Sequence, residues 1–214
     1  MPASEITLAE LLKKAGYTTG CIGKWDVPNR AAILERTPNA KGFDYYWGTL
    51  GANDGGRGIF YENNEKVGHT EDMGSLTRTY TDKAIEFLKA NRDRPFFLYL
   101  PHTMVRSVVG ASLKFKGKSK GGLYGDAVEE LEFNTGRLLD TLNELDLRDN
   151  TLFMFTSDNG PWNNFQEVLS SIGNPPAVPE DSRSLTAPGV IAESGFRELL
   201  KVYERNRGCK RMRV

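Results

Sequence analysis

Three short polar clusters in this 214-residue sequence combine residue types that could bind an anion and a metal ion together. Each cluster directly follows a segment that we predict to be a strand. Lysine and arginine suit an anionic oxyester, and aspartate and asparagine oxygens suit a hard cation such as calcium or magnesium. A metal and cations around an anion can stabilise a charged transition state. The clusters are Lys24-Trp25-Asp26, His102-Thr103 with Arg106 nearby, and Asp158-Asn159.

Each cluster also has a simpler interpretation. Asp-Asn-Gly after a strand is a common turn, and Lys24 could be an ordinary surface lysine. His102 could be a strand-end residue that is hydrogen-bonded to the backbone. The shared position at strand ends supports a common site, but the spacing alone leaves both interpretations open.

Two further segments have the composition of ligand-binding loops. The glycine-rich segment 48–58 could bind phosphate, but it lacks the Lys-Ser/Thr ending of a P-loop and no clear strand precedes it. The basic run 114–120 could contact nucleic acid, but it holds a single aromatic residue and the whole chain is neutral. We therefore interpret both segments as surface loops.

Helices and strands that would position the clusters alternate along the chain. Thr7 and Glu10 have capping-box spacing at the start of the first helix, and Gly16 suits the left-handed residue that ends it. The alternation predicts an α/β fold, in which helices flank a sheet and ligands bind beyond the carboxyl ends of its strands. Further helices are predicted over 81–91 and 124–145, strands over 17–22, 96–100 and 151–156, and irregular structure over 27–78.

Composition excludes several classes of protein. The chain has 28 basic and 28 acidic residues, which argues against a strongly basic nucleic-acid binder and an acidic disordered chain. No apolar run approaches the roughly 20 residues that span a bilayer, and the N-terminus lacks the pattern of a signal peptide. We therefore expect no membrane partner and, by default, a cytoplasmic location. Segment 163–214, rich in proline and then basic, is predicted to be a separate tail with low order.

Five motifs, in family order, resemble signatures of the sulfatase family, which belongs to the alkaline-phosphatase-like superfamily. The resemblance covers about residues 4–162, so we expect a partial sulfatase domain over 1–162. The motifs are Thr7 to Gly20 leading into Gly23-Lys24-Trp25, Lys41-Gly42-Phe43-Asp44, Arg94-Pro95-Phe96-Phe97-Leu98, Leu123-Tyr124-Gly125-Asp126, and Phe155 to Pro161.

The resemblance implies hydrolysis of sulfuric esters on an alkaline-phosphatase-like sheet. In the family, a cysteine in a Cys-x-Pro-x-Arg motif is oxidised to formylglycine, whose hydrate attacks sulfur while calcium holds the sulfate oxygens. Carried over by motif, Asp158 and Asn159 look like two calcium ligands and Lys24 like the sulfate-binding lysine. His102 and Arg106 lie where further substrate-binding residues are expected.

The sequence also departs from the family pattern. Asp26 stands where the family has a histidine, and Arg106 lies in a stretch where a second histidine is usual. Neither Cys21 nor Cys209 lies in a Cys-x-Pro-x-Arg motif, so we expect no formylglycine and no intact catalytic residue. The family's paired N-terminal aspartates, its central N-terminal strand and its second sulfate-binding lysine are also expected to be missing, which would leave the sheet and the calcium site incomplete.

Two functions are therefore compatible with the sequence. The first is a truncated sulfatase of the arylsulfatase type whose partner is a sulfate ester or another anionic small molecule, with the chain as given inactive. The alternative is a non-catalytic remnant that binds anions or a partner chain. No nucleic-acid partner is expected. The sulfatase family itself is usually periplasmic, secreted or lysosomal, which contrasts with the cytoplasmic location expected by default.

Overall fold

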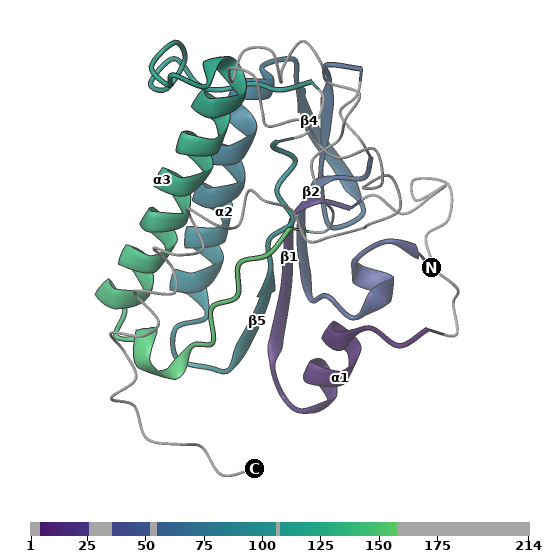
Figure 1. The fold of residues 1–214 in the computed structure, drawn as a ribbon. Coiled ribbons are helices and arrows are strands. Elements are labelled where there is room, and N and C mark those ends of the chain that lie inside the picture. The colour runs from purple at the N-terminus through teal and green to yellow at the C-terminus, as the bar shows by residue number, and fades with distance from the viewer. Residues whose placement is uncertain (1–4, 26–35, 52–54, 106–107, 158–214) are drawn as a thin grey trace, which may run out of the picture.

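The computed structural model describes residues 5–25, 36–51, 55–105 and 108–157, which form a five-stranded mixed sheet with helices on both faces (Figure 1). The strand order is β4-β3-β2-β1-β5. β1 pairs in parallel with β2 and β5, whereas β2, β3 and β4 form an antiparallel meander. The strands are β1 Thr18–Lys24, β2 Tyr45–Thr49, β3 Gly58–Glu62, β4 Glu65–Thr70 and β5 Phe96–Tyr99.

Helices cover the two faces of the sheet unequally. α2 and α3 lie side by side over one face and pack against each other, and the short α1 covers part of the other face (Figure 1). The helices are α1 Leu8–Lys14, α2 Leu76–Ala90 and α3 Gly122–Glu144, and short 3-10 turns span Asn39–Lys41, Met73–Ser75 and Arg148–Asn150.

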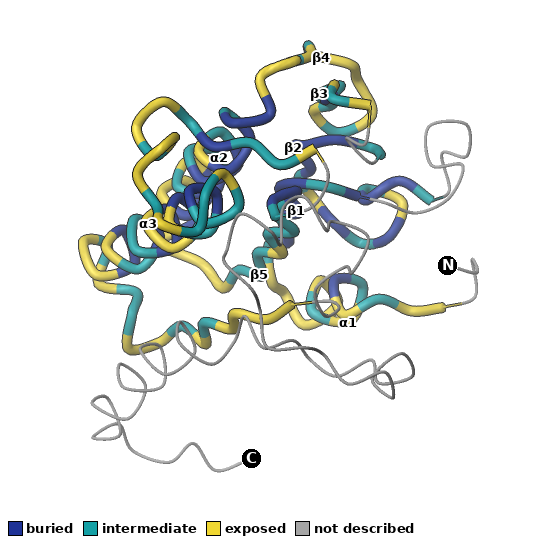
Figure 2. Tube along the Cα trace, turned by 45° about the horizontal axis from the view of Figure 1, so that its top comes forward, coloured by how far each residue is buried: buried dark blue, intermediate teal, exposed yellow. Residues whose placement is uncertain are grey.

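Alternation along β1 sends side chains into two separate cores. Ile22 packs with Trp47 and with residues of α2 and α3 on one face. Cys21 packs with Ala9, Phe43 and other residues on the face covered by α1. β1 is consequently buried over most of its length, as the dark blue centre of Figure 2 shows. None of the helices in the described ranges is long and apolar enough to span a membrane.

Several predicted elements are confirmed. The Thr7–Glu10 capping box is present at α1, and Gly16 adopts a left-handed φ of 88° just after the helix. α3 begins and ends within two residues of its predicted span, and β5 lacks only the last residue of the predicted strand. α2 begins five residues earlier than predicted, because its first turns carry threonine and arginine rather than a clear apolar face.

Two predictions for the part of the chain before α2 are wrong. Segment 27–78 is not irregular, since it contains β2, β3 and β4. β2 pairs with β1, a neighbour that is distant in sequence, and β3 and β4 pair with each other in a hairpin. The glycine-rich segment is accordingly not one loop, because Gly48 and Thr49 belong to β2 and Gly58 begins β3.

Segment 151–156 is described but forms no strand, and Leu152 is 80% exposed. An extended apolar run becomes a strand only where a neighbouring strand pairs with its backbone, and the five-stranded sheet of the described residues does not include this segment. The predicted tail, 163–214, lies outside the described residues.

Candidate functional site

Two of the three polar clusters meet where the carboxyl ends of β1 and β5 approach each other. The backbone N–H of Lys24 donates to the carbonyl of Pro101 at 2.8 Å, which places Lys24 beside His102 in the chain that follows β5. Gly23 makes this approach feasible, because a Cβ at that position would overlap the Pro101 carbonyl oxygen and its φ is 130°. In the Gly-Lys-Trp motif, Gly23 thus allows the two chain segments to approach closely, and Lys24 supplies the cation.

Lys24 is the last residue of β1 and lies half-buried, opposite Thr49 in the β1–β2 register. The next residue is anchored twice: the Trp25 backbone N–H donates to the Thr49 carbonyl at 2.9 Å, and its indole N–H donates to the Arg36 carbonyl at 2.8 Å. These bonds fix the chain directly after Lys24. A cation at the carboxyl end of a central parallel strand is suitably placed to bind an anionic ligand.

The His102 ring is neutral at physiological pH. Burial lowers its pKa to about 4, because the interior disfavours the charged imidazolium. Its Nδ1 atom is buried and has no hydrogen-bond partner among the described residues. His102 can therefore donate or accept a hydrogen bond at the site, but it cannot supply positive charge to an anion.

A chain of hydroxyl groups lies behind these residues. Thr103 Oγ1 donates to Tyr80 Oη at 3.1 Å, and Tyr80 Oη lies 3.4 Å from Thr49 Oγ1. Burial raises the pKa of Tyr80, so the phenol stays protonated. The sequence analysis missed Tyr80 and Thr49, because Tyr80 lies just before the predicted helix 81–91 and Thr49 lies in the glycine-rich segment. This network joins α2 to the ends of β2 and β5.

The remaining site predictions fall on residues outside the described part of the chain. These are Asp26, Arg106, Asp158 and Asn159, so their roles stay predictions. Within the described residues, no group of three or more histidine, cysteine, aspartate or glutamate side chains could hold a metal ion.

Cys21 is buried in the middle of β1, and burial raises the pKa of its thiol, which keeps the thiolate from forming. The side chain contributes to the core on the α1 face. Within the described structure Cys21 thus serves the packing of β1 against α1. Cys209 lies beyond the described residues.

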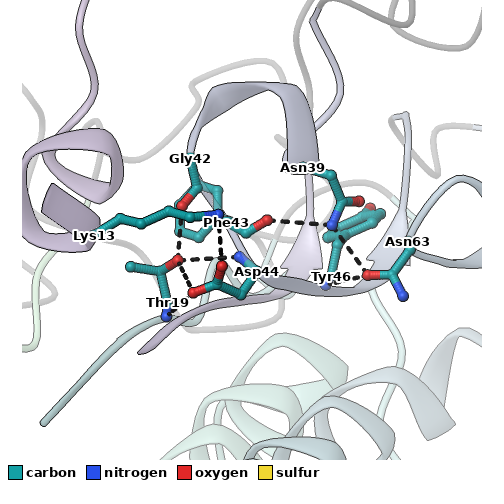
Figure 3. Close-up of polar contacts among 8 residues, drawn as sticks. All are labelled: Lys13, Thr19, Asn39, Gly42, Phe43, Asp44, Tyr46 and Asn63. Atoms are coloured by element: carbon teal, nitrogen blue, oxygen red, sulfur yellow. Dashed lines mark hydrogen bonds and ion pairs between the residues drawn. The ribbon is translucent and has the colours of Figure 1, made fainter. Parts of the chain in front are cut away.

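The Lys41-Gly42-Phe43-Asp44 motif is structural rather than part of the site (Figure 3). Asp44 Oδ2 accepts the Thr19 backbone N–H at 2.9 Å, and Asp44 Oδ1 forms an ion pair with Lys13 at 2.6 Å. Thr19 Oγ1 donates to the Gly42 carbonyl at 2.7 Å. These bonds lower the pKa of Asp44 despite partial desolvation, and they fix the start of β1 against the turn before β2.

A second part of the same network supports β2. The Asn39 side-chain amide donates to Asn63 Oδ1 at 3.0 Å and to the Phe43 carbonyl at 3.2 Å (Figure 3). Asn63 Oδ1 also accepts the Tyr46 backbone N–H at 3.1 Å. Asn63 therefore ties the β3–β4 turn to the beginning of β2.

The Leu123-Tyr124-Gly125-Asp126 motif is structural as well. Asp126 is buried, and its carboxylate accepts backbone N–H groups from Gly117, Lys118 and Ser119 at 2.7, 3.0 and 2.7 Å. These hydrogen bonds lower the pKa of Asp126, although desolvation opposes them. The motif thus anchors the loop that precedes α3.

Comparisons with known proteins agree with this architecture. The family model described as Sulfatase matches residues 2–164. N-acetylgalactosamine-6-sulfatase from Mus musculus is 37% identical in an alignment of 182 positions that covers 75% of this chain and 34% of that protein. An arylsulfatase from Hemicentrotus pulcherrimus is 31% identical over 185 residues, which are 78% and 34%. The chain therefore spans about a third of the length of these relatives.

Solved structures show the same fold. A sulfatase from Pseudoalteromonas sp. superposes with a TM-score of 0.64 at 25% identity, covering 73% of this chain and 38% of that one. A chain whose structure is described under the metabolism of multiple glycosaminoglycans by Bacteroides thetaiotaomicron superposes with a TM-score of 0.65 at 26% identity. The match covers 75% of this chain and 46% of that one. Fold, motif order and family match agree: this chain belongs to the sulfatase family.

Proposed function

We propose that this chain forms part of a sulfuric ester hydrolase of the arylsulfatase type and binds a sulfate ester at the carboxyl ends of β1 and β5. The observation that carries the proposal is the position of Lys24, held beside the Pro101-His102 segment by a backbone hydrogen bond. The relatives reported above, which are 37% and 31% identical to this chain over the matched region, are sulfatases. A chain with 26% identity was solved in complex with k-i-k-neocarrahexaose.

The described residues would act by binding and orienting the ester. The Lys24 ammonium would bind a sulfate oxygen as a charge-assisted donor. His102, neutral at physiological pH, would donate or accept one hydrogen bond without adding charge. Arg106 would supply a second cation, although a guanidinium cannot exchange a proton at neutral pH.

Calcium belongs to the proposal through the donor chemistry of Asp158 and Asn159. A carboxylate and an amide oxygen are ligands that suit a hard cation. When bound, calcium would neutralise and polarise the sulfate oxygens. Asp26 would lie near the same anion by motif position, and its carboxylate would repel sulfate unless a proton or a metal neutralised it.

We further propose that residues 1–214, made by themselves, bind the anion but do not turn over the ester. These residues contain no Cys-x-Pro-x-Arg motif, and Cys21 packs inside the sheet. Without an activated nucleophile the covalent route is closed. The same observation favours a second candidate, a non-catalytic protein that binds anions or a partner chain.

Hydrolysis and binding assays on the purified chain test both statements. With calcium and an aryl sulfate, we expect no hydrolysis above that of the Lys24→Ala, Asp158→Ala double variant. Calorimetry with inorganic sulfate should show saturable heat that Lys24→Ala abolishes and that Lys89→Ala, an exposed change on α2, retains. Calcium-dependent turnover well above the double variant would overturn the inactivity, and the absence of saturable heat would overturn the anion site.

A further inference from the structure

A cationic loop lies outside the site described above. Residues 114–120, here called the lysine loop, carry lysines at alternate positions: Lys114, Lys116, Lys118 and Lys120, all of them exposed. Among the described residues none of these ammonium groups forms an ion pair with a carboxylate. Their charge is therefore presented to solvent, although the chain as a whole is neutral.

The nearest buried acid holds the loop backbone instead of pairing with the lysines. The Asp126 carboxylate accepts the N–H groups of Gly117, Lys118 and Ser119. Gly117 has a φ of 77°, a left-handed conformation that lets consecutive N–H groups converge on one carboxylate. Charge-assisted hydrogen bonds of this kind fix the loop before any ligand arrives, which reduces the entropy cost of binding.

The start of the loop is fixed by packing. The Phe115 ring lies 5.5 Å from the Phe133 ring of α3, and Lys114 Nζ lies 3.4 Å from the centre of the Phe133 ring. The aromatic residue of the loop is thus already in contact with α3 and Lys114. The loop holds this single aromatic residue, whereas single-stranded nucleic-acid sites stack successive bases on several aromatic side chains.

The loop lies at the same end of the molecule as the ligand-binding ends of the strands. Figure 1 shows it before the amino-terminal end of α3, at the end of the fold toward which β1 and β5 run. A backbone contact supports this position: Gly74 packs directly against the Ala111 carbonyl, which brings the segment leading to the loop against the turn before α2.

We propose that the lysine loop is a contact site for a sulfated polysaccharide, so that the ligand of this protein is a polymer rather than a small aryl sulfate. A prearranged run of lysines without acidic partners among the described residues suits a polyanion, and a single aromatic residue that already packs against α3 disfavours single-stranded nucleic acid. The choice of a sulfated glycan rests on the proposed function, whereas the binding of a polyanion rests on the loop alone.

Labelled chondroitin sulfate tests the proposal by fluorescence anisotropy between about 50 and 200 mM salt. The loop variant Lys116→Gln, Lys118→Gln, Lys120→Gln leaves Lys114 on its ring. We expect its affinity to fall by about tenfold or more. The slope of log affinity against log salt concentration should shrink by roughly two to three, because each lysine contact that is lost no longer releases a counterion on binding. A matched control, Lys14→Gln, Lys66→Gln, Lys89→Gln, removes the same charge from exposed positions elsewhere and should stay within about twofold.

Several outcomes would overturn the proposal. Unchanged affinity and salt slope in the loop variant, or an equal loss in the control, would show that the lysine loop is not the contact. Equal binding of desulfated chondroitin would exclude recognition of sulfate. Equal competition by oligothymidine would show that the partner class is wrong.

Asp126→Asn supplies a second test, because it removes the carboxylate that fixes the loop but leaves every lysine in place. We expect weaker binding of chondroitin sulfate with an unchanged salt slope, since the number of cations is the same. Unaltered binding would contradict the role of preorganisation. If the parent chain bound no chondroitin sulfate but kept the saturable sulfate heat that depends on Lys24, this inference alone would be refuted. Binding of chondroitin sulfate without that sulfate heat would refute the proposed function alone.

Discussion

The two strands that flank β1 differ in what lies beyond them. On one side, β2 pairs with β3 and β3 with β4, so the ladder continues through an antiparallel hairpin. On the other side, β5 is the last strand of the described sheet, and Tyr99 is 46% exposed. The apolar segment 151–157 runs past β5 in Figure 1 without joining a strand.

The difference shows that a continuous apolar run is not sufficient for a strand. Segment 96–99 and segment 151–156 have similar composition, yet only the first finds a backbone partner, in β1. A strand needs a neighbour for its N–H and C=O groups, and the neighbour is a property of the tertiary structure. We call the β2 side closed, because the ladder continues there, and the β5 side open, and we expect substitutions on the two sides to differ in effect.

The largest expected effect is on the closed side. In Gly48→Ala the new Cβ would overlap the backbone carbonyl oxygen of Gly23 in the neighbouring strand. Relief requires separation of β1 from β2, so we expect a loss of at least about 4 kcal/mol in the free energy of unfolding. Urea unfolding measures it. Gly68→Ala in β4 meets nothing within 4 Å and should cost less than about 0.5 kcal/mol; similar losses would contradict the tight β1–β2 junction.

A matched pair of apolar truncations compares the two sides directly. Ile22 is 0% exposed and packs between the sheet and α2, so Ile22→Ala should lower the free energy of unfolding by about 3 kcal/mol. Leu152 is 80% exposed, so Leu152→Ala should change it by less than about 0.5 kcal/mol. A large loss from Leu152→Ala would show that segment 151–157 is buried in solution.

A pH effect should arise from His102, which lies three residues beyond the end of β5. Its pKa falls from 6.5 to about 4 on folding, so the unfolded chain binds more protons between these values. Stability should therefore decrease as pH falls from about 6.5 to about 4, by up to about 3 kcal/mol.

Urea unfolding at a series of pH values checks this effect. His102→Gln removes the titrating group and should flatten the dependence in that window. His69→Gln, which changes an exposed histidine of β4, should leave it intact. An unchanged slope in His102→Gln would show that another group carries the dependence.

The smallest effect on stability is expected from polar changes on the open side. Leu152→Ser, Met154→Ser replaces side chains that are 80% and 75% exposed, so the melting temperature should hardly change. Exposed apolar side chains promote association, so the variant should show less aggregation by light scattering. Equal aggregation of the variant and the parent chain would show that the association does not depend on Leu152 and Met154.

Local signals in the sequence predicted part of this fold and of its site. The Thr7–Glu10 cap, the left-handed Gly16 and the apolar face of α3 depend on neighbours within a few residues, and all are present. β2 was missed because Tyr45 to Thr49 finds its partners in β1 and β3 rather than in its own turn. Segment 151–156 was wrongly predicted to be a strand, because its apolar composition suits a strand but the sheet of the described residues does not include it.

The sequence by itself determined the family, through motifs whose order and composition the family model and the relatives share. It also determined which residue types could bind an anion. The tertiary structure alone decided the role of each motif: Lys24 lies beside His102 because Gly23 admits the Pro101 carbonyl, whereas Asp44 and Asp126 satisfy buried backbone groups. A carboxylate looks the same in a sequence whether it binds a ligand or an N–H group, and only its neighbours in space distinguish the two.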